Sequence, residues 1–259
     1  MGEMAVVRRQ IENHRCFPQP PDRDLRVWRY FGVQRFAQAM KNRAIWFSRS
    51  DLLGDPCEGS RPKGDAVLYE TARAEVIGRG DAKFFPTLRA NWKYHDDRAR
   101  TDMFISCWQM QDHDMMSMWE RYCRPGGVGV AIQTTYAKLD ASVPVSFAND
   151  RHVMLGMVTY GDYDAADFRS DPSNKYSTFM MKKIGYADER EVRLVVDMFR
   201  GEHLKGVDIP MNMRGLVERV VVSPYANPGL AAGLEKFCRG LGYTMPVLQS
   251  SLREVATVY

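Results

Sequence analysis

The sequence lacks any hydrophobic run long enough to cross a membrane. Its longest apolar stretches, such as residues 153–158, fall well short of the roughly 20 residues that a membrane helix needs. The first residues lack the apolar core of a secretory signal, and Val6 stands where a myristoylation signal has Ser or Thr. We therefore expect a cytoplasmic protein with no membrane partner.

Motifs built from cysteine, histidine or an active serine are also missing. The five cysteines include no Cys-x-x-Cys pair, and the five histidines show neither His-x-x-x-His nor His-Glu-x-x-His spacing. A Gly-x-Ser-x-Gly elbow is absent as well. These absences argue against a disulfide framework and an α/β-hydrolase, and the sequence predicts no metal site.

Charge of one sign is not in large excess. There are 36 Lys and Arg against 32 Asp and Glu, which gives a formal charge of +4, and 45% of the residues are hydrophobic. This composition is typical of a globular protein. The small basic excess permits a nucleic-acid or protein partner but provides no dedicated basic stripe.

The order of apolar segments indicates the fold class. Strands are expected near residues 27–30, 45–47, 103–108, 128–133, 153–160 and 217–222, and helices near 33–40, 115–122, 175–184 and 228–241. Because this order is mixed rather than strictly alternating, it favours an α+β fold with a mixed or antiparallel sheet core and flanking helices.

One domain is expected after a proline-rich N-terminal leader. The leader covers residues 1–24, and a single α+β domain covers residues 25–259. A charged, glycine-containing insertion at about residues 59–101 interrupts the domain. We predict that this insertion is the least rigid part and borders the functional cleft as a lid.

The most informative segment for chemistry is residues 189–197. If it is one strand, Glu189, Glu191 and Arg193 share a face opposite to Val192, Leu194 and Val196. Neighbouring carboxylates repel, which raises the pKa of one of them unless Arg193, Lys182 or Lys183 offsets the charge. A solvated, self-neutralising strand face is the simpler interpretation of this triplet.

Two other places carry weaker signals. Trp119 and Tyr122 lie on one helical face shortly after Ser106, a spacing more typical of core packing than of ligand contact. In the turn at residues 53–58, Asp55 and Glu58 either cap the following segment or bind a cation, and capping is the commoner role.

Several short motifs occur together in one order, namely 28–30 (WRY), 44–48 (AIWFS), 54–58 (GDPCE), 105–107 (ISC), 118–122 (MWERY), 127–130 (GVGV) and 182–193 with its Glu-x-Glu-x-Arg ending. This ordered set resembles a bacterial family catalogued as domain of unknown function 2971, although Gly54 and Cys57 depart from the residues usual there. The resemblance implies an association with phage defence and abortive infection.

A more distant likeness suggests a mechanism. The layout is similar to that of ADP-ribosyltransferases, in which a first-strand residue and a middle serine hold NAD and a late Glu-x-Glu carries the chemistry. That likeness implies Glu191 and Glu189 as catalytic residues, NAD as substrate, and a cofactor-binding set consisting of Arg29, Tyr30, Ser106, Trp119 and Tyr122. Glu191 would stabilise the oxocarbenium-like centre formed at the ribose, as carboxylates do in glycosidases.

Three hypotheses therefore remain open. The first is an ADP-ribosyltransferase-like enzyme, a toxin or effector of anti-phage defence, that modifies a protein or nucleic acid. For this enzyme we expect Glu191→Gln to abolish NAD turnover while leaving folding nearly unchanged. The second is a metal-dependent nuclease that uses Asp55, Glu58, Glu189 and Glu191 on Mg²⁺. The third is a non-catalytic sensing or binding module.

Overall fold

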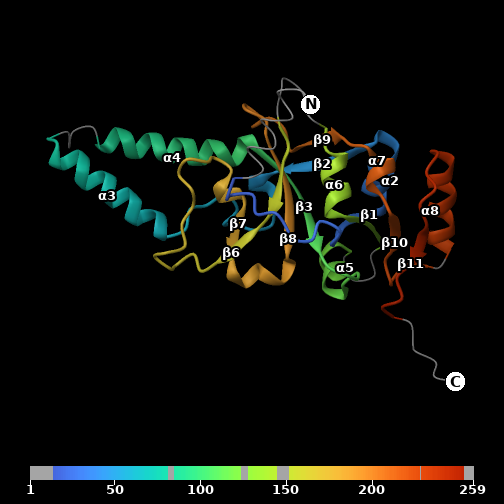
Figure 1. Cartoon of the computed structure of the whole chain (residues 1–259). Coiled ribbons are helices and arrows are strands. Elements are labelled where there is room, and N and C mark those ends of the chain that lie inside the picture. Colours follow the sequence, from blue (N-terminus) through green and yellow to red (C-terminus); the bar gives the residue numbers. More distant parts are fainter. Residues whose placement is uncertain (1–13, 81–84, 124–127, 145–151, 228, 254–259) are drawn as a thin grey trace. The chain divides into compact units, whose positions relative to one another are not determined.

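The computed structural model describes residues 14–80, 85–123, 128–144, 152–227 and 229–253 (Figure 1). The described residues divide into two compact units. Unit 1 takes its residues from Met1–Gln19, Phe47–Ser106 and Val145–Val207, and unit 2 takes its residues from Pro20–Trp46, Cys107–Pro144 and Asp208–Tyr259. Each unit is described separately below.

Unit 2 is built on strands that pair in the order β11-β10-β4-β1-β3. Strand β1 (Arg26–Gly32) is antiparallel to β4 (Gly129–Thr135) along its whole length, from Arg26 opposite Thr135 to Gly32 opposite Gly129. Strand β10 (Arg219–Val222) is antiparallel to β4, whereas β11 (Val247–Gln249) is parallel to β10. Its helices are α2 (Val33–Asn42), α5 (Met116–Tyr122), α6 (Tyr136–Ser142), α7 (Met213–Leu216) and α8 (Gly229–Gly240).

Unit 1 places β8 (Glu191–Asp197) between β5 (Met154–Met157) and β3 (Met103–Met110). A separate two-stranded sheet consists of β6 (Thr159–Gly161) and β7 (Met181–Lys183), which run parallel. The helical elements are η1 (Ser50–Leu52), α3 (Gly64–Gly78), α4 (Phe85–Asp102), η3 (Ser177–Phe179) and η4 (Ile184–Glu189). Figure 1 shows α3 and α4 extending together away from the strands of this unit.

Three strands contribute residues to both units: β2 (Ala44–Arg49), β3 and β9 (Gly206–Pro210). Strand β2 is antiparallel to β3, with Ser48 opposite Ile105, and β9 pairs with β2. Both parallel and antiparallel pairs occur, and helices accompany the strands throughout. The predicted α+β class with a large mixed sheet is thus confirmed.

Most elements expected from the sequence are present, but several boundaries differ. The prediction of a helix at residues 175–184 is wrong, because that segment contains the short 3₁₀ helix η3 followed by strand β7. The strand expected from residue 189 begins only at Glu191, and the stretch expected as one strand at 153–160 is divided between β5 and β6. The sequence also predicts that residues 125–127 (PGG) end the helix near 115–122, and these residues lie outside the described part of the chain.

The charged insertion is more regular than its composition indicated, since α3 and α4 occupy most of it. Helix α3 buries only Gly64 and Asp65, so the turns of this helix beyond its first are mainly exposed. Residues 14–17 of the predicted leader are part of unit 1, where Cys16 and Phe17 are buried and Phe17 packs directly against Gly156. A side chain added at Gly156 would collide with the Phe17 backbone.

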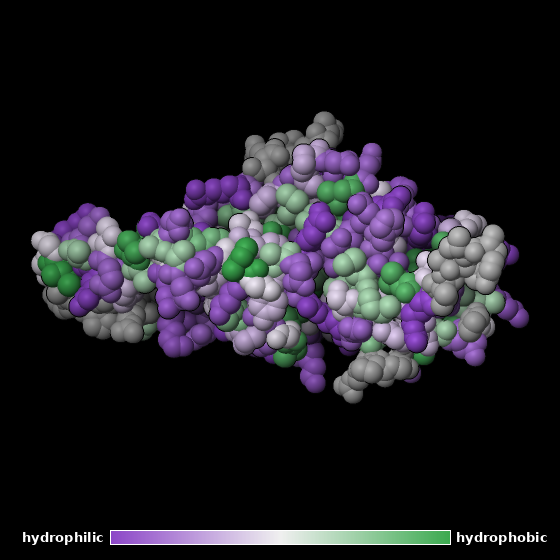
Figure 2. Space-filling model, turned by 90° about the horizontal axis from the view of Figure 1, so that it is seen from below, coloured by the Kyte–Doolittle hydropathy of each residue, from purple (hydrophilic) through white to green (hydrophobic). Residues whose placement is uncertain are grey.

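Within the described ranges, no helix combines the length and hydrophobicity needed to cross a membrane. On the face seen in Figure 2, hydrophobic residues form small separate spots among hydrophilic ones.

Candidate functional site

Five charged side chains converge inside unit 1, and we call them the charge cluster. They come from the turn before α3, from β7, from the end of η4 and from β8, and they are Glu58, Lys182, Glu189, Glu191 and Arg193. All five are buried. Burying so many charges is unfavourable unless they pair and are hydrogen-bonded, and this cluster meets that condition.

Arg193 is the centre of the charge cluster and is completely buried. Its two terminal nitrogens donate to the two carboxylate oxygens of Glu58 at 2.6 and 2.8 Å. Its Nε donates to Glu191 Oε2 at 2.7 Å, and Nη1 also donates to the carbonyl oxygen of Phe179 at 2.5 Å. This two-point pairing with a carboxylate is the strongest geometry available to an arginine.

Lys182 connects the other two carboxyl groups. Its Nζ donates to Glu189 Oε2 at 2.5 Å and to Glu191 Oε1 at 3.1 Å. The ammonium group also lies 4.7 Å from the centre of the Tyr186 ring, within cation–π distance. Glu191 is therefore bound by a cation at each of its two oxygens.

The local backbone explains how Glu189 and Glu191 reach the same ammonium group. Glu189 ends the 3₁₀ helix η4, and Arg190 then adopts a left-handed conformation, with φ of 42°, before β8 begins. Because Arg190 adopts this left-handed conformation, Glu189 is not part of the regular strand. Its carboxyl group reaches the same ammonium group as that of Glu191. The backbone of Glu191 is also held, since its N–H donates to Tyr160 Oη at 2.8 Å and its carbonyl accepts from Val158 N at 2.9 Å.

The position next to Glu58 in the charge cluster, Gly59, requires glycine. Gly59 has a φ of 69°, and a Cβ atom there would lie 2.4 Å from the Phe179 ring. Any larger residue would displace either Phe179, whose carbonyl binds Arg193, or the neighbouring Glu58.

The charge cluster contains more carboxyl groups than cations. Three carboxyl groups face two cations, so full ionisation would leave a net charge of −1 in a buried site. This excess of carboxyl groups favours a raised pKa for at least one of them.

The environments of Glu189 and Glu191 shift their pKa values in opposite directions. Burial, followed by the neighbouring Glu191, raises the pKa of Glu189. Burial also acts to raise the pKa of Glu191, but Arg193, Glu189 and Lys182 outweigh it and hold that pKa below its usual range. Pairs of carboxyl groups with pKa values pushed apart are typical of acid–base sites.

Lys182 and Glu58 complete the charge balance. Burial acts to lower the pKa of Lys182, but the adjacent Glu191 and Glu189 reverse the effect and raise it, so this amine stays charged. Burial raises the pKa of Glu58, and the paired Arg193 opposes that change. The neutral form of Glu189, which its raised pKa favours, would leave two carboxylates to balance the two cations.

The sequence-predicted residues are found in both units. Ser106 belongs to unit 1, as do Glu189 and Glu191, and it is 0% exposed on β3. Arg29 belongs to unit 2, where its guanidinium group donates to the carbonyl oxygens of Cys107 and Trp46. Arg29 also faces the rings of Phe31 and Trp108.

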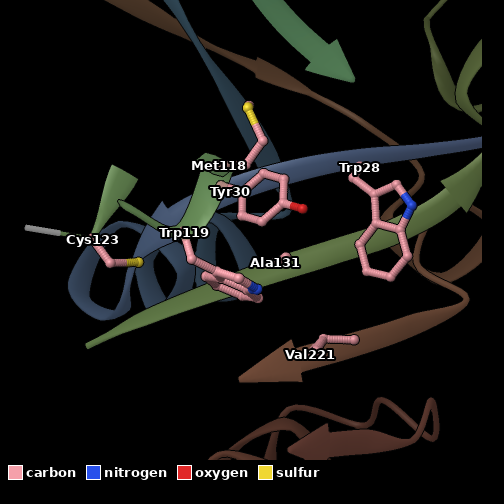
Figure 3. Close-up of a cluster of buried hydrophobic side chains, with 7 residues drawn as sticks. All are labelled: Trp28, Tyr30, Met118, Trp119, Cys123, Ala131 and Val221. Carbon is pink, nitrogen blue, oxygen red and sulfur yellow. The ribbon is translucent and has the colours of Figure 1, made fainter. Parts of the chain in front are cut away.

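The predicted cofactor-binding residues Tyr30 and Trp119 belong to a buried cluster in unit 2, which we call the aromatic cluster (Figure 3). Tyr30 and Trp119 meet edge to face at 4.8 Å, and the third predicted residue, Tyr122, stacks on Tyr30 at 5.9 Å. Trp119 is 0% exposed and donates from Nε1 to Asp114, whereas Tyr122 is 46% exposed. Arg29 and Tyr30 are successive strand residues, so their side chains project from opposite faces of β1.

In the turn that contains Asp55 and Glu58, only Asp55 has the capping role that the sequence predicted. Asp55 does satisfy a local N–H group, since it accepts from Cys57 N at 2.8 Å. Glu58 instead is committed to Arg193. The nuclease hypothesis needs Glu58 and Glu191 to hold a cation, but in this arrangement both carboxylates bind the guanidinium group of Arg193, which disfavours that hypothesis.

Comparisons with protein-family models, curated proteins and solved structures find no match to this chain. The likeness to the bacterial family and to ADP-ribosyltransferases therefore stays a prediction from the sequence.

Proposed function

We propose that the protein cleaves the bond between ribose and nicotinamide in NAD and transfers the ADP-ribosyl group to an acceptor. The observation that carries this proposal is the pair of adjacent carboxyl groups of Glu189 and Glu191, which both bind Lys182 in the charge cluster and whose pKa values are shifted in opposite directions. Breaking an N-glycosidic bond develops positive charge on the sugar, which a fixed carboxylate stabilises. The proposal extends to an acceptor that is a protein or nucleic acid and to a role in phage defence.

The two carboxyl groups take different parts in this proposal. Glu191 supplies the negative charge that faces the developing cation. The raised pKa of Glu189 favours its neutral form, which both donates and accepts hydrogen bonds and so orients the acceptor group. Lys182 and Arg193 fix both carboxyl groups in place, and we regard them as positioning residues.

Access to the pair is a structural requirement of the proposal. Glu189 and Glu191 are only 5% and 8% exposed, and η4, which contains Tyr186 and ends at Glu189, leads directly into the site. This short 3₁₀ helix begins with Ile184, an apolar side chain that is 59% exposed. We infer that η4 moves when substrate binds, because a 3₁₀ helix has few hydrogen bonds to lose.

Ligand-dependent thermal stability tests this proposal against its alternatives. A ligand that binds only the folded protein raises the melting temperature, so NAD should raise it and MgCl₂ should not. Asp188→Asn, which changes an exposed neighbour of Glu189, should respond like the wild type. A rise with MgCl₂ alone would favour the nuclease, and no response to either would favour a non-catalytic module.

One observation favours the non-catalytic alternative specifically. Every nitrogen of Arg193 already has an acceptor inside unit 1, and its side chain is 0% exposed. A saturated buried network of this kind also occurs where its only role is to fix a fold. In that case the charge cluster would tolerate Glu189→Gln without any change in function.

A further inference from the structure

Unit 1 contains a second group of reactive side chains, none of which belongs to the charge cluster. It contains His14, Cys16 and Asp171, and we call it the His-Cys-Asp cluster. One potential ligand atom from each residue lies within 4.8 Å of the other two, and among the described residues this is the one group of three or more such side chains. Cys16 and Asp171 are buried, and His14 is half-buried.

We propose that His14, Cys16 and Asp171 bind one Zn²⁺ ion. Imidazole, thiolate and carboxylate are the three ligand types that zinc takes in proteins, and three protein ligands leave a fourth position open. This inference is independent of the proposed activity on NAD. The sequence predicted no metal site because the proposed ligands form no local motif. Two of them lie at positions 14 and 16, whereas the third is Asp171, far away along the chain.

Surrounding groups hold the ligands in orientation. Asp171 Oδ1 accepts from the N–H and the hydroxyl of Ser173 at 3.0 and 2.6 Å, which directs Oδ2 toward His14. His14 Nε2 lies 3.5 Å from Oδ2, and Asn174 contacts the opposite ring nitrogen at 3.2 Å. Ser177 Oγ accepts from the Asp171 N–H at 2.7 Å. Such outer contacts are what fix metal ligands in known sites.

Arg15 occupies the place of a cation in this arrangement. Its Nε donates to Asp171 Oδ2 at 2.6 Å, while 77% of its side chain is exposed. A guanidinium group so exposed can turn into solvent when a metal ion takes its position. Arg15 is therefore a competitor of the metal, and removing it should strengthen metal binding.

Binding requires a balanced exchange of protons. The Cys16 thiol loses its proton to solvent as the sulfur binds the cation. His14 Nδ1 accepts a long hydrogen bond from Cys16 N, so the neutral ring carries its proton on Nε2. Binding through Nε2 requires that proton to move to Nδ1, which then gives up its contacts with both Cys16 N and Asn174 Nδ2. The bound ion would link residues 14–16 to the segment that contains residues 171–177 through its ligands His14, Cys16 and Asp171.

Titration of the chelator-treated full chain, without a polyhistidine tag, tests the proposal. Co²⁺ should bind with one-to-one stoichiometry and give a thiolate-to-cobalt charge-transfer band, and Zn²⁺ should displace it. Cys16→Ser should lose the band and weaken Zn²⁺ binding by at least about tenfold, with Asp171→Asn also weakening it. Cys57→Ser changes a half-buried cysteine outside the cluster and should bind like the wild type.

The exposed residue Arg15 keeps the test decisive even if a buried variant fails to fold. Arg15→Ala should bind Zn²⁺ more tightly than the wild type. The proposal is overturned if the wild type binds no Co²⁺ stoichiometrically, if Cys16→Ser keeps the charge-transfer band, or if Arg15→Ala leaves Zn²⁺ affinity unchanged or lower.

Discussion

Glu189 and Glu191 are chemically identical residues that the chain places in different electrostatic states. Glu189 contacts one cation and a neighbouring carboxyl group, whereas Glu191 contacts both Lys182 and Arg193. The difference therefore depends on which residue is closer to the guanidinium group. This difference gives the proposed activity two adjacent carboxyl groups whose pKa values are shifted in opposite directions.

The raised pKa of Glu189 predicts how stability depends on pH. A carboxyl group whose pKa is higher in the folded state stabilises the fold fully below its unfolded value, about 4.3, and this contribution is lost as the pH rises through the folded value. The groups that face Glu189 are Lys182 and Glu191, with Arg193 beyond them. Glu189→Gln does not titrate, so its free energy of unfolding relative to the wild type should increase between pH 5 and pH 8.

Urea denaturation at several pH values measures this difference. Glu202→Gln, which changes an exposed glutamate in the same unit, should show a constant offset from the wild type. Identical pH profiles for Glu189→Gln and the wild type would show that Glu189 is ionised in the folded protein.

Glu191→Gln is expected to destabilise the protein, which differs from the expectation drawn from the sequence. Glu191 is buried between Lys182 and Arg193, so its removal leaves both cations incompletely paired. Breaking a buried ion pair costs on the order of 3–5 kcal/mol of unfolding free energy. Glu235→Gln breaks the exposed pair with Arg239 and should cost less than about 1 kcal/mol. Equal effects of the two variants in urea denaturation would contradict the buried network.

The sequence could identify some of these residues but not their pairing. It drew attention to Glu189, Glu191 and Arg193 and named Lys182 as a neutralising neighbour. It could not pair Glu58 with Arg193, because 135 positions separate them and an isolated turn glutamate carries no signal of its distant partner. The buried state of the triplet was also missed, since alternation indicates which residues share a face but not what covers that face.

At the scale of elements, prediction succeeded where apolar periodicity was strong. Helix α2 buries Phe36 and Met40 as the spacing indicated, and β1, β3 and β4 appear where β-branched and aromatic residues gather. Prediction was wrong at residues 175–184, because η3 and β7 are each three residues long and such short elements produce no period. No helix was predicted at α3 and α4 within the charged insertion, because their charge and glycines obscured a helical pattern.

Helix α5 shows how two aromatic residues on one element can differ in role. Trp119 packs against Tyr30 and donates to Asp114, which also accepts from Ser250. Trp119→Ala should therefore lower the free energy of unfolding by about 3–5 kcal/mol, as large-to-small core changes do. Tyr122→Ala should cost clearly less, because nearly half of that side chain is exposed.

Urea denaturation of the two variants measures their stability, and an NAD-dependent thermal shift measures ligand binding. A stable Trp119→Ala protein that no longer responds to NAD would move Trp119 from the core of unit 2 to a binding site.

At the scale of the whole molecule, the sequence predicted one domain over residues 25–259, and the described residues form two compact units that share strands β2, β3 and β9. Each unit is assembled from three separate stretches of chain, an arrangement that composition alone cannot reveal. The mixed order of strands and helices nevertheless indicated the α+β class correctly. The charge cluster belongs entirely to unit 1, and the aromatic cluster belongs entirely to unit 2.

The release of nicotinamide from NAD by the full chain tests the central claim most directly. We predict measurable release by the wild type and by the exposed-neighbour control Asp188→Asn. Glu189→Ala, which removes the hydrogen-bonding group, should reduce release on the order of 100-fold without loss of folded protein, the scale seen when one preorganised hydrogen-bonding group is removed from an active site. Absence of release by the wild type with cell-lysate acceptors present, or equal release by Glu189→Ala and the wild type, would contradict the claim that this carboxyl pair acts on NAD.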